Sequence, residues 1–97
     1  MKLRYTPNAA AELDLVLSDI AEKSPQGARR VQGRIQAIMD LLLEQPRSGR
    51  LTSLPPLRRI VATPFPYLIF YEATGGEVVI IGVRHAARDP SSMPGQS

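Results

Sequence analysis

The first half of the chain shows two hydrophobic periods, which predict a strand followed by two helices. Residues 2–6 alternate polar and apolar side chains, as a short half-buried strand does. Thr6 and Pro7 then suit the N-cap and the first position of a helix, and a second helix is expected from about residue 25 to residue 45. The apolar stripes of the two helices recur at helical spacing: Leu13, Val16, Leu17, Ile20 and Ala21, then Ala28, Val31, Ile35, Ile38, Met39 and Leu42.

The second half of the chain contains short runs of β-branched and aromatic residues that predict three strands. These runs cover residues 57–63, 67–72 and 77–84. A stiff connection at residues 64–66 separates the first two strands, and Gly75-Gly76 is a hairpin turn signal between the last two. Residues 47–56 are rich in Pro, Gly and Ser and are expected to form a loop, in which Gly49 permits a positive φ.

The expected order of elements is β-αα-βββ, which indicates an α+β fold. Neither apolar helix stripe can remain in water, so the helices are expected to form an αα-hairpin on one face of an antiparallel sheet. A chain of 97 residues is one domain. We assign that domain to residues 1–89 and expect residues 90–97, which are polar and rich in Pro, Ser and Gly, to be a flexible C-terminal tail.

The composition argues against several classes of site and location. The chain has no cysteine, which excludes disulfides and thiolate metal sites and fits a reducing cytoplasm. One histidine and scattered acidic residues give no metal-ligand spacing, and there is no phosphate-binding glycine loop, so we expect no metal and no cofactor. No apolar run approaches the ~20 residues that span a bilayer, and the start lacks the pattern of a secretory signal. The expected location is cytoplasmic, without a membrane partner.

Arginine dominates the positive charge of the chain. The net charge is +3, and ten of the twelve basic residues are arginine, the two lysines being Lys2 and Lys23. The planar guanidinium suits phosphate and carboxylate groups, so this excess is consistent with RNA, DNA or an acidic protein as partner. A genome rich in G and C gives a similar ratio, because its codons favour arginine over lysine.

The last predicted strand runs into the main candidates for chemistry, which are Arg84, His85 and Arg88. His85 is the only histidine, and imidazole is the side chain best suited to acid–base chemistry near neutral pH. The alternative is a structural histidine that is bonded to a backbone carbonyl or to Asp89. The sequence alone leaves both interpretations of His85 open.

The paired arginines of the first late strand are further candidates. Arg58 and Arg59 are neighbours in a strand, so their side chains point to opposite faces of the sheet. One is expected to face solvent or a partner, and the other to lie over the helix surface with its stem packed. Residues 46–50 end the second helix and are a candidate contact loop.

Six short motifs occur in a consistent order along the chain: Tyr5-Thr6-Pro7, Ala11-Glu12-Leu13-Asp14-Leu15, Pro46-Arg47-Ser48-Gly49-Arg50, Arg58-Arg59, Tyr67-Leu68-Ile69-Phe70-Tyr71 and Val83-Arg84-His85-Ala86-Ala87-Arg88-Asp89. In this order and spacing they resemble the RelE/ParE superfamily of toxins from bacterial type II toxin–antitoxin modules. The resemblance implies a microbial-RNase-like α+β fold and an antitoxin whose C-terminal segment wraps the toxin. RelE-like members cleave mRNA in the ribosomal A site, whereas ParE-like members poison DNA gyrase, which leads to DNA breaks.

The residues at the candidate site favour the ParE-like branch. RNA cleavage needs a base, an acid and cations around the attacked phosphate. RelE-like members supply these groups with clustered lysines and arginines and a late tyrosine, or with a Glu, Arg and His-Tyr set. In this chain both lysines lie in or near the first strand and helix, and no tyrosine follows Tyr71. Arginine stays protonated, so it stabilises charge but transfers protons poorly.

We therefore predict a toxin, not enzymatic in itself, that inhibits DNA gyrase and is neutralised by a cognate antitoxin in a hetero-oligomer. One alternative is a RelE-like ribosome-dependent endoribonuclease that acts on mRNA, and the other is a degenerate toxin that only binds antitoxin. The stripe Tyr67, Ile69 and Tyr71 is expected to be core or a surface shared with the antitoxin. The residues expected to bind the target are Arg58, Arg59, Arg84, His85 and Arg88; a ribonuclease would use His85, Arg58, Arg59 and Arg84.

Overall fold

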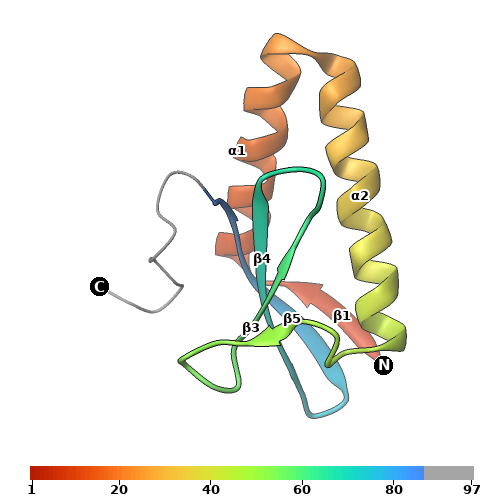
Figure 1. The fold of residues 1–97 in the computed structure, drawn as a ribbon, viewed down its shortest axis with the longest axis vertical. Coiled ribbons are helices and arrows are strands. Elements are labelled where there is room, and N and C mark those ends of the chain that lie inside the picture. The colour runs from red at the N-terminus through yellow and green to blue at the C-terminus, as the bar shows by residue number, and fades with distance from the viewer. Residues whose placement is uncertain (87–97) are drawn as a thin grey trace.

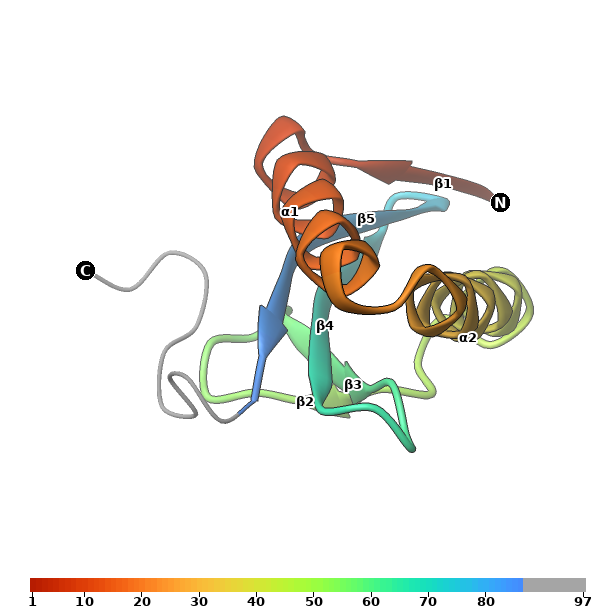
Figure 2. The same cartoon turned by 90° about the horizontal axis from the view of Figure 1, so that it is seen from above.

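Two helices cover one face of a five-stranded sheet (Figures 1 and 2). The structure is a computed structural model that describes residues 1–86, so the end of the assigned domain, Arg88 and the predicted tail lie outside the described residues. The α+β class and the order β-αα-βββ are confirmed, with one additional two-residue strand in the segment expected to be a loop. The elements are β1 (Lys2–Tyr5), α1 (Pro7–Lys23), α2 (Pro25–Glu44), β2 (Arg50–Leu51), β3 (Arg58–Val61), β4 (Tyr67–Thr74) and β5 (Glu77–His85).

The ends of the helices are set by capping residues in the sequence. The hydroxyl of Thr6 accepts a hydrogen bond from the amide of Ala9 (3.1 Å) at the start of α1. Ser24 ends α1 and also begins α2, where its hydroxyl accepts from the amide of Gly27 (3.0 Å). One residue therefore separates the helices, and they fold back on each other as the predicted αα-hairpin (Figure 1). Within residues 1–86, neither helix is long and apolar enough to cross a membrane.

The sheet has the strand order β1-β5-β4-β3-β2. Strands β3, β4 and β5 form the predicted antiparallel meander, but β1 runs parallel to β5, so the sheet is mixed rather than wholly antiparallel. Only tight hairpin turns force neighbouring strands to be antiparallel, and β1 is connected to its neighbour through both helices and the meander. β1 pairs with residues 77–80 of β5 only, so within residues 1–86 no strand pairs with residues 81–85 on that side.

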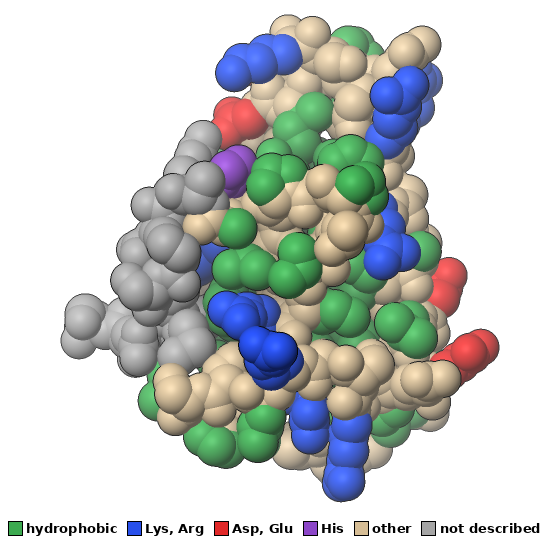
Figure 3. Space-filling model, viewed as in Figure 1, with side chains coloured by type: hydrophobic (Ala, Val, Ile, Leu, Met, Phe, Trp, Pro, Cys, Tyr) green, Lys and Arg blue, Asp and Glu red, His purple; other side chains and the backbone are tan. Residues whose placement is uncertain are grey.

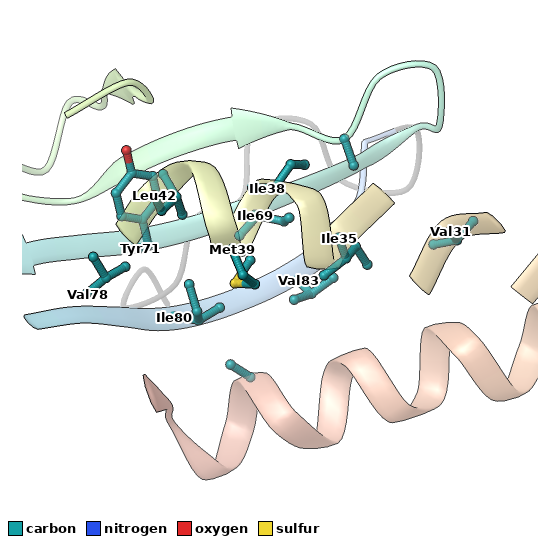
Figure 4. Close-up of a cluster of buried hydrophobic side chains, with 12 residues drawn as sticks. Val31, Ile35, Ile38, Met39, Leu42, Ile69, Tyr71, Val78, Ile80 and Val83 are labelled. Atoms are coloured by element: carbon teal, nitrogen blue, oxygen red, sulfur yellow. The ribbon is translucent and has the colours of Figure 1, made fainter. Parts of the chain in front are cut away.

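The main core lies between the helices and the sheet (Figure 4). A smaller apolar cluster on the opposite sheet face contains Leu57, Leu68 and Phe70. Alternate residues of β4 belong to these two clusters, because successive side chains of a strand point to opposite faces. We call the face that carries Leu68 and Phe70 the open face, because neither of the helices in residues 1–86 covers it. The main core is formed by Val31, Ile35, Ile38, Met39 and Leu42 of α2 with Ile69, Tyr71, Val78, Ile80 and Val83 of the sheet.

Tyr71 fixes the course of the chain after α2. Its hydroxyl accepts a hydrogen bond from the amide of Gly49 and donates one to the carbonyl of Pro46, both at 2.8 Å. A Cβ atom at Gly49 would lie 2.5 Å from this hydroxyl oxygen, so a side chain there would collide with the buried tyrosine. The expectation of a positive φ at Gly49 is wrong: within residues 1–86, positive φ occurs at Gly75 and Gly76, and Gly49 is needed for close approach instead.

Candidate functional site

Arg58 and Arg59 point to opposite faces, as strand alternation predicts. Arg58 is opposite Tyr71, which faces the helices, whereas Arg59 is opposite Phe70 on the open face. The guanidinium of Arg58 donates hydrogen bonds to the carbonyls of Gly49 (2.8 Å) and Arg47 (3.4 Å). Arg58 therefore holds the turn after α2 in place, whereas Arg59, which is also half-buried, points to the open face.

The edge of β5 beyond the end of β1 is occupied by Glu12 of α1. One carboxylate oxygen of Glu12 accepts a hydrogen bond from the amide of Val83 (3.1 Å), and the other lies 3.3 Å from Nε of Arg84. An unpaired strand edge exposes backbone donors that invite pairing with another chain. Glu12 satisfies one of these donors and fixes the position of Arg84, and it does so from an element that sequence analysis did not connect with this strand.

His85 packs against a neighbouring aromatic ring at the end of the sheet. It is opposite Tyr67 in the β4–β5 pairing, and the two rings meet edge to face with centroids 5.3 Å apart. Both side chains are half-buried. Within residues 1–86, no group of three or more His, Cys, Asp or Glu side chains is placed to hold a metal ion.

A groove of about 260 Å³ lies between α1 and the end of β5. The most exposed apolar residue of the groove is Leu15, with 66% of its surface accessible to solvent. The helix side of this groove was not predicted from the sequence, although its residues follow one another at helical spacing along α1 and Leu15 is a large apolar side chain outside the predicted apolar stripe. The groove is lined by Glu12, Leu15, Val16 and Asp19 of α1 and by Tyr67, Val83, Arg84 and His85 of the sheet.

The residues predicted for a ribonuclease do not converge on one point. Arg58 is opposite Tyr71 of β4 and His85 is opposite Tyr67, four residues along the same strand. Four residues of strand span roughly 13 Å. Arg59 lies on the open face, opposite Phe70, whereas Arg84, opposite Leu68, lies at the edge of β5 beside Glu12 of α1. A single phosphate could therefore not contact the imidazole and all three of these guanidinium groups in the observed arrangement.

Two of the three residues expected at the antitoxin surface are core residues. Ile69 and Tyr71 have no exposed surface, because both point from the central strand into the helix-covered side of the sheet. The assignment of Ile69 and Tyr71 to a contact surface is therefore wrong for this structure, and their alternative assignment to the core holds. Tyr67 is half-buried and lines the groove.

Comparisons with known proteins agree on one group of relatives. Residues 3–90 match the family described as "ParE toxin of type II toxin-antitoxin system, parDE". The chain is 39% identical to Toxin RelE2 of Caulobacter vibrioides over 84 residues, which cover 87% of this chain and 93% of that protein. It is 35% identical to Y4kP of Sinorhizobium fredii over 85 residues, 88% of each chain. Its fold is similar to a chain of the solved "Chromosomal ParDE TA system from P. aeruginosa", with a TM-score of 0.74, 23% identity, and coverage of 88% of this chain and 95% of that one.

Proposed function

Because this chain belongs to the ParE toxin family of bacterial type II toxin–antitoxin systems, we propose that it inhibits DNA gyrase and is neutralised by a cognate antitoxin. The observation that carries this proposal is the family match, which extends over residues 3–90. The toxin would act in the cytoplasm, where gyrase is found, and would be held inactive in a hetero-oligomer with its antitoxin.

The geometry of the candidate site supports binding rather than RNA cleavage. Cleavage would need a proton acceptor and a proton donor close to one phosphate, with cations around it. The imidazole of His85 lies against Tyr67, and the arginines that could stabilise the phosphate are spread over two faces. These arginines remain charged and can bind an anionic surface without transferring protons.

The groove between α1 and β5 is the surface that we propose for the antitoxin. Its apolar floor includes Leu15, Tyr67 and Val83, and Arg84 and His85 lie on its sheet side. A disordered antitoxin segment with apolar residues at intervals and acidic residues between them could fold into this groove. Such a segment would cover Leu15, the most exposed of the apolar side chains there.

One observation favours a second candidate function, which is ribosome-dependent cleavage of mRNA. The relative with 39% identity carries the name RelE2, which is the name of the ribonuclease branch of the superfamily. A ribonuclease would rely on His85 as its proton carrier, so His85→Ala would abolish cleavage of mRNA on translating ribosomes. A degenerate toxin that keeps only antitoxin binding would have neither activity.

Induced expression in a bacterial host tests the proposal. We expect growth arrest with induction of the DNA-damage response while cellular mRNA stays intact, and relief of the arrest by co-expression of a candidate antitoxin from the neighbouring reading frame. Arrest accompanied by loss of mRNA would instead support the ribonuclease. Normal growth on full expression would support the degenerate toxin.

A further inference from the structure

Arg50 and Arg59 are held side by side on the open face of the sheet. They are directly opposite each other in the antiparallel pairing of β2 with β3. Arg59 is also opposite Phe70 of the open-face cluster, so both arginine side chains leave the sheet on that face. The Cα atoms of such a pair are about 4.5–5.5 Å apart. Like charges directly opposite each other destabilise a sheet, so this arrangement needs an explanation.

The backbone on both sides of β2 imposes the arrangement. Before the strand, the amide of Gly49 donates to the buried hydroxyl of Tyr71 (2.8 Å). After it, the amide and the hydroxyl of Thr52 both donate to the carbonyl of Leu57, each at 2.9 Å. The two-residue strand is therefore anchored at both ends, which fixes the neighbouring backbone positions from which the two arginine side chains leave the sheet.

Nothing acidic in the described part of the chain neutralises this pair. Within residues 1–86, the carboxylates in ion pairs go to Arg4 and Arg84, and neither Arg50 nor Arg59 has an acidic partner. Residues 45–71 contain four arginines and no Asp or Glu, so this segment carries a formal charge of +4 in a chain with a net charge of +3. A codon preference would add arginines along the whole chain but would not remove acidic residues from one segment.

The surface around the pair is also basic. Figure 3 shows basic side chains gathered over the region of β2 and β3, with acidic side chains only near the margins of this view. Ser48 and Ser53 flank β2 and are exposed, and hydroxyl groups are common donors to phosphate oxygens. Phe70 is 1% exposed, so it offers no platform on which the bases of a single strand could stack.

We propose that Arg50 and Arg59, which we call the β2–β3 arginine pair, bind the phosphate backbone of duplex DNA. The inference rests on the proposed function, because a toxin that inhibits gyrase would lie close to the DNA that gyrase holds. Guanidinium forks donate hydrogen bonds to phosphate oxygens, and a row of phosphate charges relieves the repulsion between the two arginines. Contact with the backbone needs no recognition of bases, in keeping with the lack of an aromatic platform on this surface.

The test measures binding of the full-length toxin to a short fluorescein-labelled DNA duplex by fluorescence anisotropy at several salt concentrations. The variant is R50Q/R59Q, and the matched control is R29Q/R34Q, which removes the same charge from exposed positions of α2. We expect R50Q/R59Q to bind roughly tenfold more weakly and to reduce the slope of log K against log salt by about 1.8, whereas the control keeps the slope of the unmodified chain. Thermal unfolding should show R50Q/R59Q at least as stable as the unmodified toxin, because the repulsion is gone.

Three results would overturn the proposal. The first is an absence of duplex binding by the unmodified toxin, and the second is an equal loss of binding in both double variants. The third is unchanged duplex binding by R50Q/R59Q; if this variant also loses binding to DNA-free gyrase, the pair is assigned to an acidic protein surface instead. A parallel supercoiling assay separates this proposal from the gyrase target: duplex binding by a toxin that leaves gyrase fully active would support the DNA surface and reject the target.

Discussion

At the scale of single residues, the hydroxyl of Tyr71 joins the core to the segment after α2. Tyr71→Phe should lower the free energy of unfolding by about 2 kcal/mol, because the buried amide of Gly49 and the carbonyl of Pro46 both lose their partner. Urea denaturation measures this change. Tyr67→Phe is the control, since its hydroxyl makes no hydrogen bond within residues 1–86 and its loss should have little effect. Equal destabilisation by the two substitutions would contradict this role of Tyr71.

Replacement by alanine should change the stability of the protein in opposite directions at Gly49 and at Gly33. Gly49→Ala places a Cβ atom 2.5 Å from the oxygen of Tyr71, a side chain that has no space to move, so the protein should be destabilised. Gly33 lies inside α2 with nothing within 4 Å of the added atom, so Gly33→Ala should stabilise the protein by about 0.5–1 kcal/mol. Thermal unfolding compares the two variants. A higher melting temperature for Gly49→Ala would show that the turn adapts to a side chain.

Individual residues show what the sequence can and cannot predict. The opposite directions of Arg58 and Arg59 were predicted from strand alternation alone, and the structure confirms them. The reason for Gly49 could not be found, because it depends on Tyr71, which lies 22 residues further along the chain. The same holds for Glu12, whose contact with Val83 crosses 71 residues. The local spacing of hydrophobic residues does not show which distant residue a polar group will contact.

At the scale of elements, α1 protects the half of β5 that lies beyond its pairing with β1. Glu12→Ala should leave the amide of Val83 without its acceptor and lower the free energy of unfolding by about 1 kcal/mol. The ion pair with Arg84 adds at most about 1 kcal/mol, because both side chains are roughly one third exposed. Hydrogen exchange measured by NMR should show faster exchange of the Val83 amide in Glu12→Ala. Glu12→Gln keeps an acceptor and should retain protection; unchanged protection in Glu12→Ala would refute this role.

Elements with a sustained period were predictable, and elements without one were not. Both helices, their shared cap at Ser24 and the three strands of the meander follow from hydrophobic spacing and turn residues. β2 has two residues, too few to show a period, and its pairing depends on contacts made by the segments that flank it. The parallel direction of β1 depends on how the helix pair packs on the sheet, which no local pattern specifies.

At the scale of the whole molecule, the proposed partners use separate surfaces. The groove between α1 and β5 would take the antitoxin, and the β2–β3 arginine pair lies at the other edge of the sheet, on the open face. Arg84 and His85 were predicted from the sequence to bind the target, and the structure places both in the groove, whereas the helix side of the groove was not predicted. The reason is that a groove forms between elements, and the sequence indicates each element alone.

The proposed antitoxin surface can be tested with one substitution that introduces a charge at the groove. Leu15→Asp should weaken antitoxin binding by at least tenfold, because a carboxylate would replace the exposed apolar side chain that the antitoxin is expected to cover. Isothermal titration calorimetry measures the affinity. Leu43→Asp is the matched control, since Leu43 is also an exposed leucine but does not line the groove. Equal affinity of Leu15→Asp and the unmodified toxin would place the antitoxin elsewhere.

A supercoiling assay with purified toxin, purified DNA gyrase, relaxed plasmid and ATP measures gyrase inhibition directly. Rising toxin concentration should stop supercoiling, and added antitoxin should restore it. On translating ribosomes, the unmodified toxin and the His85→Ala variant should both leave mRNA intact. Full gyrase activity at a large excess of toxin, with transcripts cut on translating ribosomes, would show that the toxin is a ribonuclease and not a gyrase inhibitor.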